Sequence, residues 1–204
     1  MIRIPDFMRD FGDYEKLQAA VVSLGYIWYR GDMAINFISL RTTKKPSTKF
    51  DDFFFCANEI GSHKRVTIFP GTTNAPVRFL RKGSNPAGIA QACTGQHVDA
   101  FMAGDHKGRA ALRNDAKNPI AYQRYNPDTG ILGEEVYNNY IGLHFHDAGS
   151  NRDGTRNIGG YSEGCQNPTY QEDVTFMRNQ LIYQGRRGHG DKLTNTIIGL
   201  WELM

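Results

Sequence analysis

The chain has 204 residues, of which 40% are hydrophobic, and its 24 Lys and Arg against 21 Asp and Glu give a net charge of +3. This length fits a single domain with a sizeable core. Neither the charge balance nor any dense basic run indicates nucleic-acid binding. We therefore do not expect nucleic acid as a partner. No stretch approaches the roughly 20 apolar residues of a membrane span, so we expect no membrane span either.

The N-terminus and the cysteines bear on where the protein is made. The first 16 residues carry charges throughout and lack the apolar core of a signal peptide, so we expect synthesis in the cytoplasm without one. Cys56, Cys93 and Cys165 are odd in number and form no CxxC pair. This pattern argues against a disulfide framework or a zinc site, and the sequence implies no metal or cofactor.

Taken in chain order, the elements predict a mainly β fold. Asp13 caps a predicted helix over 14–24, which Gly25 ends. Strand-like runs follow at 33–41, 50–57, 65–69, 119–124 and 140–146, whereas 83–118 is typical of long loops with short strands. A second helix is predicted from Pro168 to about Tyr183, and a last strand over 194–203. We expect a β-sandwich or barrel with one or two peripheral helices: a helical and aromatic segment, 1–30, packed on a domain of 31–204.

Several conspicuous side chains have structural interpretations. Tyr26, Trp28 and Tyr29 are expected to pack beside the N-terminal helix. Asp51 and Asp52 are expected to cap backbone amides in a turn. Cys56, in a Phe-rich run, is expected in the core, and Cys93 is expected to have no special role.

The segment 140–167 holds the residues best suited to catalysis. Side chains alternate along a strand, so His144 and His146 are expected on one face, and the glycine-rich loop after them can return Cys165 to that face. A free thiol is only a few per cent ionised at pH 7, and a neighbouring imidazole would activate it through an ion pair and return the proton to a leaving amine. Gly164 permits a tight turn, whose amides would form an oxyanion hole. Spacing alone leaves the alternative open that Cys165 is a core residue and the histidines are merely hydrogen-bonded.

The same segment resembles the active-site signature of L,D-transpeptidases, in which a histidine precedes a Ser/Thr-His-Gly-Cys element that ends in Asn. It is more similar to a phage and prophage branch of that fold, with Gly-x-Asn-x-His followed by Trp-Ser-Ala-Gly-Cys-Gln. Here these elements correspond to 142–146 and 161–166. Further similar segments occur in the same order, at 35–41, 49–52, 72–76, 95–97 and 104–112.

The resemblance implies roles for individual residues. Cys165 would be the nucleophile and His146 its base, with backbone donors from Gly164 and Cys165 and a loop shaped by Ser162. The second histidine of the family is Glu163 here, and the phage branch lacks that histidine too. His144 is the alternative base. The remaining candidates for lining the site are His106, Glu163 and Gln166.

The function that follows is a phage lysin-type cysteine peptidase that cleaves peptidoglycan peptides through an acyl-enzyme. One alternative is an L,D-transpeptidase, which passes the acyl group to an amine. Another is a non-catalytic virion structural or cell-wall-binding protein. The expected partners are bacterial peptidoglycan and other virion or tail proteins of a phage, and the protein would reach the wall after release by lysis or as part of a virion.

Overall fold

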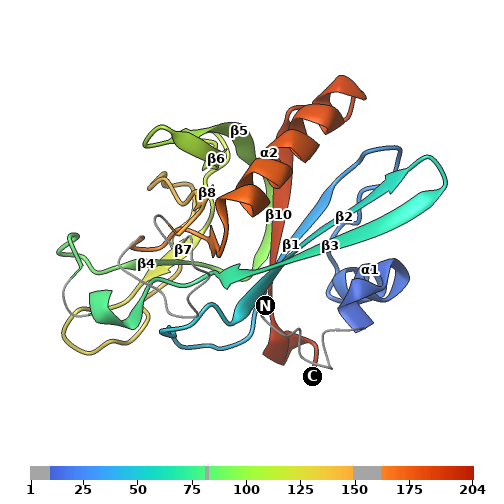
Figure 1. Ribbon diagram of the computed structural model, residues 1–204. Helices are drawn as coiled ribbons and strands as arrows, with labels where there is room; N and C mark the ends of the chain where they lie inside the picture. Colours follow the sequence, from blue (N-terminus) through green and yellow to red (C-terminus); the bar gives the residue numbers. More distant parts are fainter. Residues whose placement is uncertain (1–9, 81–82, 149–161) are drawn as a thin grey trace.

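The computed structural model describes residues 10–80, 83–148 and 162–204. Residues 1–9 of the expected N-terminal segment and Tyr161 of the motif lie outside this description. An eight-stranded sheet, in the order β8-β6-β5-β10-β1-β2-β3-β9, curls into a nearly closed barrel beside the two-stranded sheet β4-β7 (Figure 1). The expectation of a mainly β fold with two helices is confirmed.

The elements have the following bounds. The strands are β1 Asn36–Arg41, β2 Asp52–Ile60, β3 His63–Thr72, β4 Ala90–Ala92, β5 Gly95–His106, β6 Arg109–Asn114, β7 Tyr122–Arg124, β8 Phe145–His146, β9 Asn167–Pro168 and β10 Lys192–Gly199. The helices are α1 Tyr14–Ser23 and α2 Gln171–Arg186, with short 3-10 turns at Asp10–Gly12, Val77–Phe79 and Leu200–Glu202. No helix in the described part of the chain is long and apolar enough to cross a membrane.

Strand β1 lies at the centre of the sheet, parallel to β10 and antiparallel to β2, and every one of its residues is buried. Its side chains alternate between two hydrophobic cores. Phe37 packs with Met177 of α2, whereas Ile38 and Leu40 pack with Leu17 of α1. The two helices therefore cover opposite faces of the sheet (Figure 1), and the strand between them is buried on both faces.

The N-terminal helix forms as the sequence indicates. The Asp13 carboxylate accepts a hydrogen bond from the Lys16 amide at 3.0 Å, and the helix ends at Ser23. The rings of Trp28 and Tyr14 pack edge to face with centroids 5.2 Å apart, which confirms that Trp28 packs beside the helix.

The prediction of long loops over 83–118 is wrong. Most of this stretch forms the long hairpin β5–β6, which pairs with β10 near the centre of the sheet. Lys107 and Gly108 have φ of 52° and 76°, so a two-residue turn joins the strands. The alternation of apolar and polar residues that would have indicated a strand is hidden in β5. Glycines lie near both of its ends, and its pairing with β10 is irregular opposite 193–195.

The boundaries of the C-terminal elements also need correction. Pro168 does not open a helix but pairs with Gly71 in β9, and α2 begins at Gln171 and continues through Gly185. Pairing with β3 overrides the local preference of proline for a first helical turn. The last strand ends at Gly199, where a 3-10 turn follows.

Asp52 is a buried carboxylate that ties three segments together. It accepts hydrogen bonds from the amides of Thr42 at 2.8 Å and Thr73 at 2.7 Å, and from the Thr73 hydroxyl at 2.8 Å. The same hydroxyl accepts from Nε of the buried Arg41 at 2.9 Å. Burial raises the pKa of Asp52, and the amides and Arg41 counteract it. The expectation that Asp52 caps backbone amides is confirmed, whereas the Asp51 side chain has no such bond among the described residues.

Asp52→Ala should lower the free energy of unfolding by about 3 kcal/mol, because it leaves buried donors without an acceptor. Chemical denaturation of the full chain measures this. Asp51→Ala is the matched control and should change stability by less than about 0.5 kcal/mol. Equal effects of the two substitutions would contradict this assignment.

Candidate functional site

The site is organised by a parallel bridge between Phe145 and Gln166, which joins the two ends of the curled sheet. The His146 amide donates to the Gln166 carbonyl at 3.1 Å, and the Gln166 amide donates to the His144 carbonyl at 2.9 Å. Paired residues point to the same side of a sheet and their neighbours to the other. Phe145 and Gln166 are fully buried in the core, so the other face receives His144, His146, Cys165 and Asn167.

Cys165 is partly exposed beside a cavity of about 210 Å³ that Gly142 and Glu163 also line. Its Sγ accepts a hydrogen bond from the His144 amide at 3.4 Å and donates to the Gly142 carbonyl at 3.6 Å. Burial raises the pKa of the thiol, and the Ser162 contact, the His144 amide and Lys107 oppose this. The resting thiol is therefore neutral at pH 7.

Gly164 and Ser162 shape the turn that presents this thiol. Gly164 has φ of 147°, and a Cβ there would lie 2.6 Å from the Ala90 carbonyl oxygen, so the turn requires glycine. The Ser162 hydroxyl accepts hydrogen bonds from the amides of Gly164 at 3.3 Å and Cys165 at 2.8 Å. The expected oxyanion hole is thus not free in this structure, because both of its amides are already bonded to Ser162.

His146 is held in the tautomer that suits a base. Its Nδ1 lies 2.8 Å from the Asp147 carbonyl oxygen, which can only accept, so Nδ1 carries the proton and Nε2 keeps its lone pair. The Asp147 carboxylate forms an ion pair with Arg109 at 2.5 Å, and Asn167 Nδ2 donates to the His146 carbonyl at 2.8 Å. Asn167 Nδ2 also lies 3.2 Å from Nδ1 and 3.4 Å from Nε2 of His146, so the ring and the backbone of this histidine are both held.

His144 has the opposite tautomer. The Asn114 amide donates to its Nδ1 at 3.0 Å, so the proton of the neutral ring lies on Nε2. The Nδ1 lone pair of His144 is occupied by the Asn114 amide, and its Nε2–H is a donor, so the ring has no free lone pair. The hydrogen bonds favour His146 over His144 as the base.

His106 completes a cluster of three imidazoles. Its ring stacks on His146 with centroids 4.6 Å apart and lies 5.2 Å from His144. Burial and, to a smaller extent, the neighbouring imidazoles together lower the pKa of both His144 and His146 to about 4, so both are neutral at pH 7. The ion pair expected from the sequence is therefore not the resting state. Within the described residues no group of histidine, cysteine and carboxylate side chains could hold a metal ion.

Glu163 and Gln166 occupy different environments. The Glu163 carboxylate accepts from the Ser84 amide at 2.8 Å and from the Ser84 hydroxyl at 2.7 Å, which fastens the 83–89 segment to the cysteine turn at the rim of the cavity. Gln166 points into the core, where its Oε1 accepts from the Ser39 hydroxyl at 2.7 Å. The prediction that Gln166 lines the site is wrong, because its position in the bridge directs it to the opposite face.

The other cysteines are buried. Burial raises the pKa of Cys56 to about 12 and that of Cys93 to about 11, so neither thiol is ionised at pH 7. Cys56 packs in the core beside α2, as expected.

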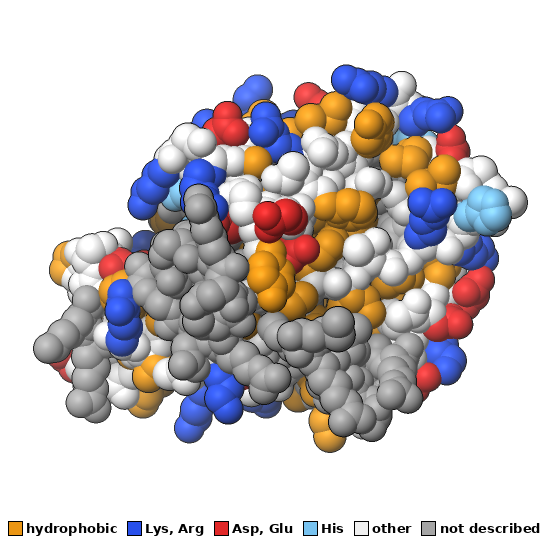
Figure 2. Space-filling view, in the orientation of Figure 1, with side chains coloured by type: hydrophobic (Ala, Val, Ile, Leu, Met, Phe, Trp, Pro, Cys, Tyr) orange, Lys and Arg blue, Asp and Glu red, His pale blue; other side chains and the backbone are white. Residues whose placement is uncertain are grey.

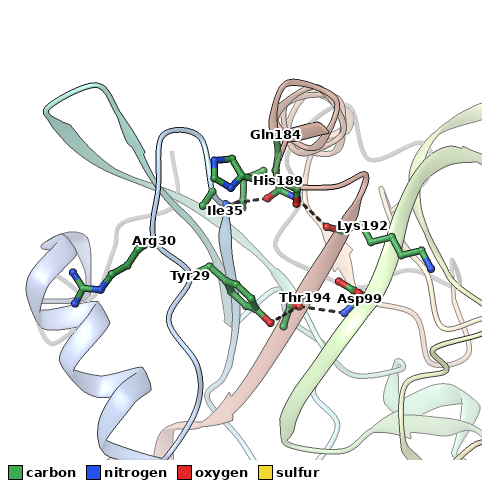
Figure 3. Close-up of a pocket in the computed structure, with 9 residues that line it drawn as sticks. Tyr29, Arg30, Ile35, Asp99, Gln184, His189, Lys192 and Thr194 are labelled. Atoms are coloured by element: carbon green, nitrogen blue, oxygen red, sulfur yellow. Dashed lines mark hydrogen bonds between the residues drawn. The ribbon is translucent and has the colours of Figure 1, made fainter. Parts of the chain in front are cut away.

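A smaller cavity of about 100 Å³ lies elsewhere, between the end of α2 and β10 (Figure 3). Gln184 crosses it, accepting from the Ile35 amide at 3.0 Å and donating to the Lys192 carbonyl at 2.9 Å. Tyr29 and Thr194 bond to one another at 3.1 Å, and the side chains of Arg30 and Lys192 point away (Figure 3). These polar groups satisfy one another, which indicates a structural role.

Comparison with protein-family models, with curated proteins and with solved structures found no match. Several supporting residues were missed by sequence reasoning. Ser84, Arg109 and Asn114 lie far along the chain from the motif and carry no local signal, whereas Asn167 closes the motif itself. The visible face in Figure 2 has basic and acidic side chains interspersed around hydrophobic ones, so no single charge dominates it.

Alkylation of Cys165 by iodoacetamide should accelerate as pH rises from 7 to 10, with a midpoint above the usual thiol range, because the thiol is buried and both histidines are neutral. Peptide mapping by mass spectrometry measures the rate at this residue and, as internal controls, at Cys56 and Cys93. A fast plateau between pH 5 and 7 would reveal a resting ion pair and contradict the neutral state.

Glu163→Ala should increase hydrogen exchange at the Ser84 amide about tenfold, since the amide loses a charged acceptor. Glu163→Gln is the matched control: it keeps one oxygen as acceptor and should show a smaller increase. Unchanged exchange in Glu163→Ala would show that this contact does not hold the segment.

Proposed function

We propose that this protein is a cysteine peptidase that cleaves peptide bonds of bacterial peptidoglycan, with Cys165 as nucleophile and His146 as base. The observation that carries the proposal is the bridge between Phe145 and Gln166, whose register turns Cys165 and the two histidines to the same face, with Sγ 3.4 Å from the His144 amide nitrogen. A buried core cysteine would not need the strained glycine turn that sets the Cys165 thiol at a cavity.

The chemistry begins from a neutral pair. As Sγ attacks the carbonyl carbon of the scissile bond, its proton passes to Nε2 of His146, whose Nδ1 remains bonded to the Asp147 carbonyl. The tetrahedral intermediate collapses when the same proton is given to the leaving amine, which forms a thioester at Cys165. Water then attacks the thioester carbonyl while Nε2 takes its proton, and the thiol leaves with that proton. A neutral start is compatible with catalysis because proton transfer accompanies the attack.

His144 supplies a donor for the developing negative charge. Its Nε2 carries a proton, and a Cβ added at Gly142 would lie 3.3 Å from that nitrogen, so the ring edge lies beside the residue that contacts the thiol. The amides of Gly164 and Cys165 are bonded to Ser162. We therefore assign the oxyanion donor to His144, joined by those amides only when substrate displaces the Ser162 hydroxyl.

The substrate class rests on the resemblance of the 142–146 and 161–166 segments to the phage branch of L,D-transpeptidases. The cavity beside Cys165 is compatible with a peptide, because its wall includes Arg124, which can face a carboxylate, and backbone of the 141–143 segment. The proposed setting is the cell wall, which the protein reaches after lysis or as part of a virion.

Purified bacterial sacculi incubated with the wild type should release soluble muropeptides, measured by liquid chromatography and mass spectrometry. Cys165→Ala should release none, and His146→Gln should be slower by about 10²- to 10⁴-fold. His144→Gln keeps an N–H donor and the base, so it should lose less than His146→Gln. Cys56→Ala is the matched cysteine control, outside the cavity beside Cys165, and should retain activity.

Equal release by the wild type and Cys165→Ala would defeat the proposal. New crosslinked dimers in place of shorter peptides would instead identify an amine as the acceptor. Binding to sacculi without any covalent change would identify the protein as a non-catalytic wall-binding protein.

A further inference from the structure

A second cavity of about 520 Å³ lies at the far end of the small sheet β4-β7 from Cys165. At one end of this ladder Ala90 pairs with Arg124, and both line the cysteine cavity. At the other end the Cys93 amide donates to the Ala121 carbonyl at 2.9 Å, and both of these residues line the second cavity.

The segment 137–142 joins the two cavities along the surface. Tyr137 and Asn138 line the second cavity, whereas Ile141 and Gly142 line the cysteine cavity. The residues between them are exposed. Along β4 the separation from Ala90 to Cys93 is three strand residues, or roughly 10 Å. A ligand bound at the second cavity and a peptide of about three extended residues could therefore occupy the two sites together.

The polar groups of the second cavity are neutral hydrogen-bonding groups and one cation. His97 donates through Nε2 to the Cys93 carbonyl at 3.0 Å, which leaves its Nδ1 lone pair open. Asn118 uses its NH₂ group on Asp115 at 3.1 Å and keeps its amide oxygen. The Asn138 side chain and the exposed Lys117 ammonium have no hydrogen-bond or ion-pair partner among the described residues.

An exposed aromatic ring borders these groups. Tyr137 is 62% exposed, although its hydroxyl already donates to Glu135. Its ring face is thus the part available to a ligand. Asn138 has φ of 56°, which turns the chain at this edge of the cavity. Among the residues that the structure describes, no carboxylate lines the cavity. A flat ring, open amides and a cation suit a ligand with an apolar C–H face and several hydroxyl or acetamido groups, whose oxygens an ammonium can also bind.

We propose that this cavity is a saccharide subsite for an N-acetylated sugar of the glycan strand that carries the peptide cleaved at Cys165. The inference rests on the proposed function and extends it. Tyr137 stacks on the sugar ring, Asn138 and Asn118 bond its hydroxyl and acetamido groups, and the Lys117 ammonium donates to sugar hydroxyl or acetamido oxygens. The sugar and the scissile peptide bond are then bound at opposite ends of the small sheet β4-β7.

The first test measures binding of N-acetylglucosamine tetramer to the full-length Cys165→Ala variant by NMR titration. Amide shifts at Lys117, Asn118 and Asn138 are expected, and Tyr137→Ala in the same background should weaken binding about tenfold. Tyr183→Ala, an exposed tyrosine on α2 outside both cavities, is the matched control and should bind as the parent does. Absence of binding, or shifts confined to other residues, overturns the subsite.

The second test compares turnover of one peptide in free form and attached to N-acetylmuramic acid. Tyr137→Ala and Asn138→Gly, which suits the positive φ, should each raise KM about tenfold for the sugar-linked peptide and leave the free peptide unchanged. Equal KM changes for both substrates, or none, overturn the subsite while the peptidase proposal stands. If the wild type cleaves neither peptide, the peptidase proposal fails, and the saccharide titration alone decides whether the subsite exists.

Discussion

The backbone bridge between Phe145 and Gln166 is the constraint on which the site depends. It joins β8 and β9, which stand at opposite ends of the strand order, so it helps to close the curled sheet. It also fixes which side chains face the core in two segments that are 21 residues apart in sequence. Because Phe145 and Gln166 turn into the core, their neighbours must turn the other way, which places Cys165 and the two histidines on the same face, with the Cys165 Sγ 3.4 Å from the His144 amide nitrogen. Folding and the assembly of the site are therefore one event.

The contacts around the bridge give the two histidines different hydrogen-bonding properties. His144 and His146 are both buried and both neutral at pH 7. They differ in what lies opposite Nδ1, a backbone amide for His144 and a backbone carbonyl for His146, and only His146 also has the Asn167 side-chain nitrogen beside its ring, 3.4 Å from Nε2. One ring thus presents a proton and the other a lone pair. The peptidase mechanism that we propose uses both, a base for the nucleophile and a donor for the oxyanion, and neutral partners avoid the cost of buried charge.

The sequence indicated the parts of the fold that depend on local pattern and missed those that depend on pairing across the chain. The helix capped by Asp13 and the buried run of β1 were predictable from capping and composition. The β5–β6 hairpin was not, because glycines interrupt its alternation, and Pro168 joined a strand through its pairing with Gly71. At the site, alternation predicted that the two histidines share a face. It could not predict their tautomers, because the Asn114 amide reaches His144 through a tertiary contact and the local backbone conformation turns the adjacent Asp147 carbonyl toward His146.

The most direct test of this account is the protonation of the two rings, read from long-range ¹H–¹⁵N NMR spectra of the full chain at pH 7. The account predicts that both are neutral, with the proton on Nδ1 in His146 and on Nε2 in His144. Two rings with the same tautomer, the reverse assignment, or a charged His146 beside a thiolate would contradict it.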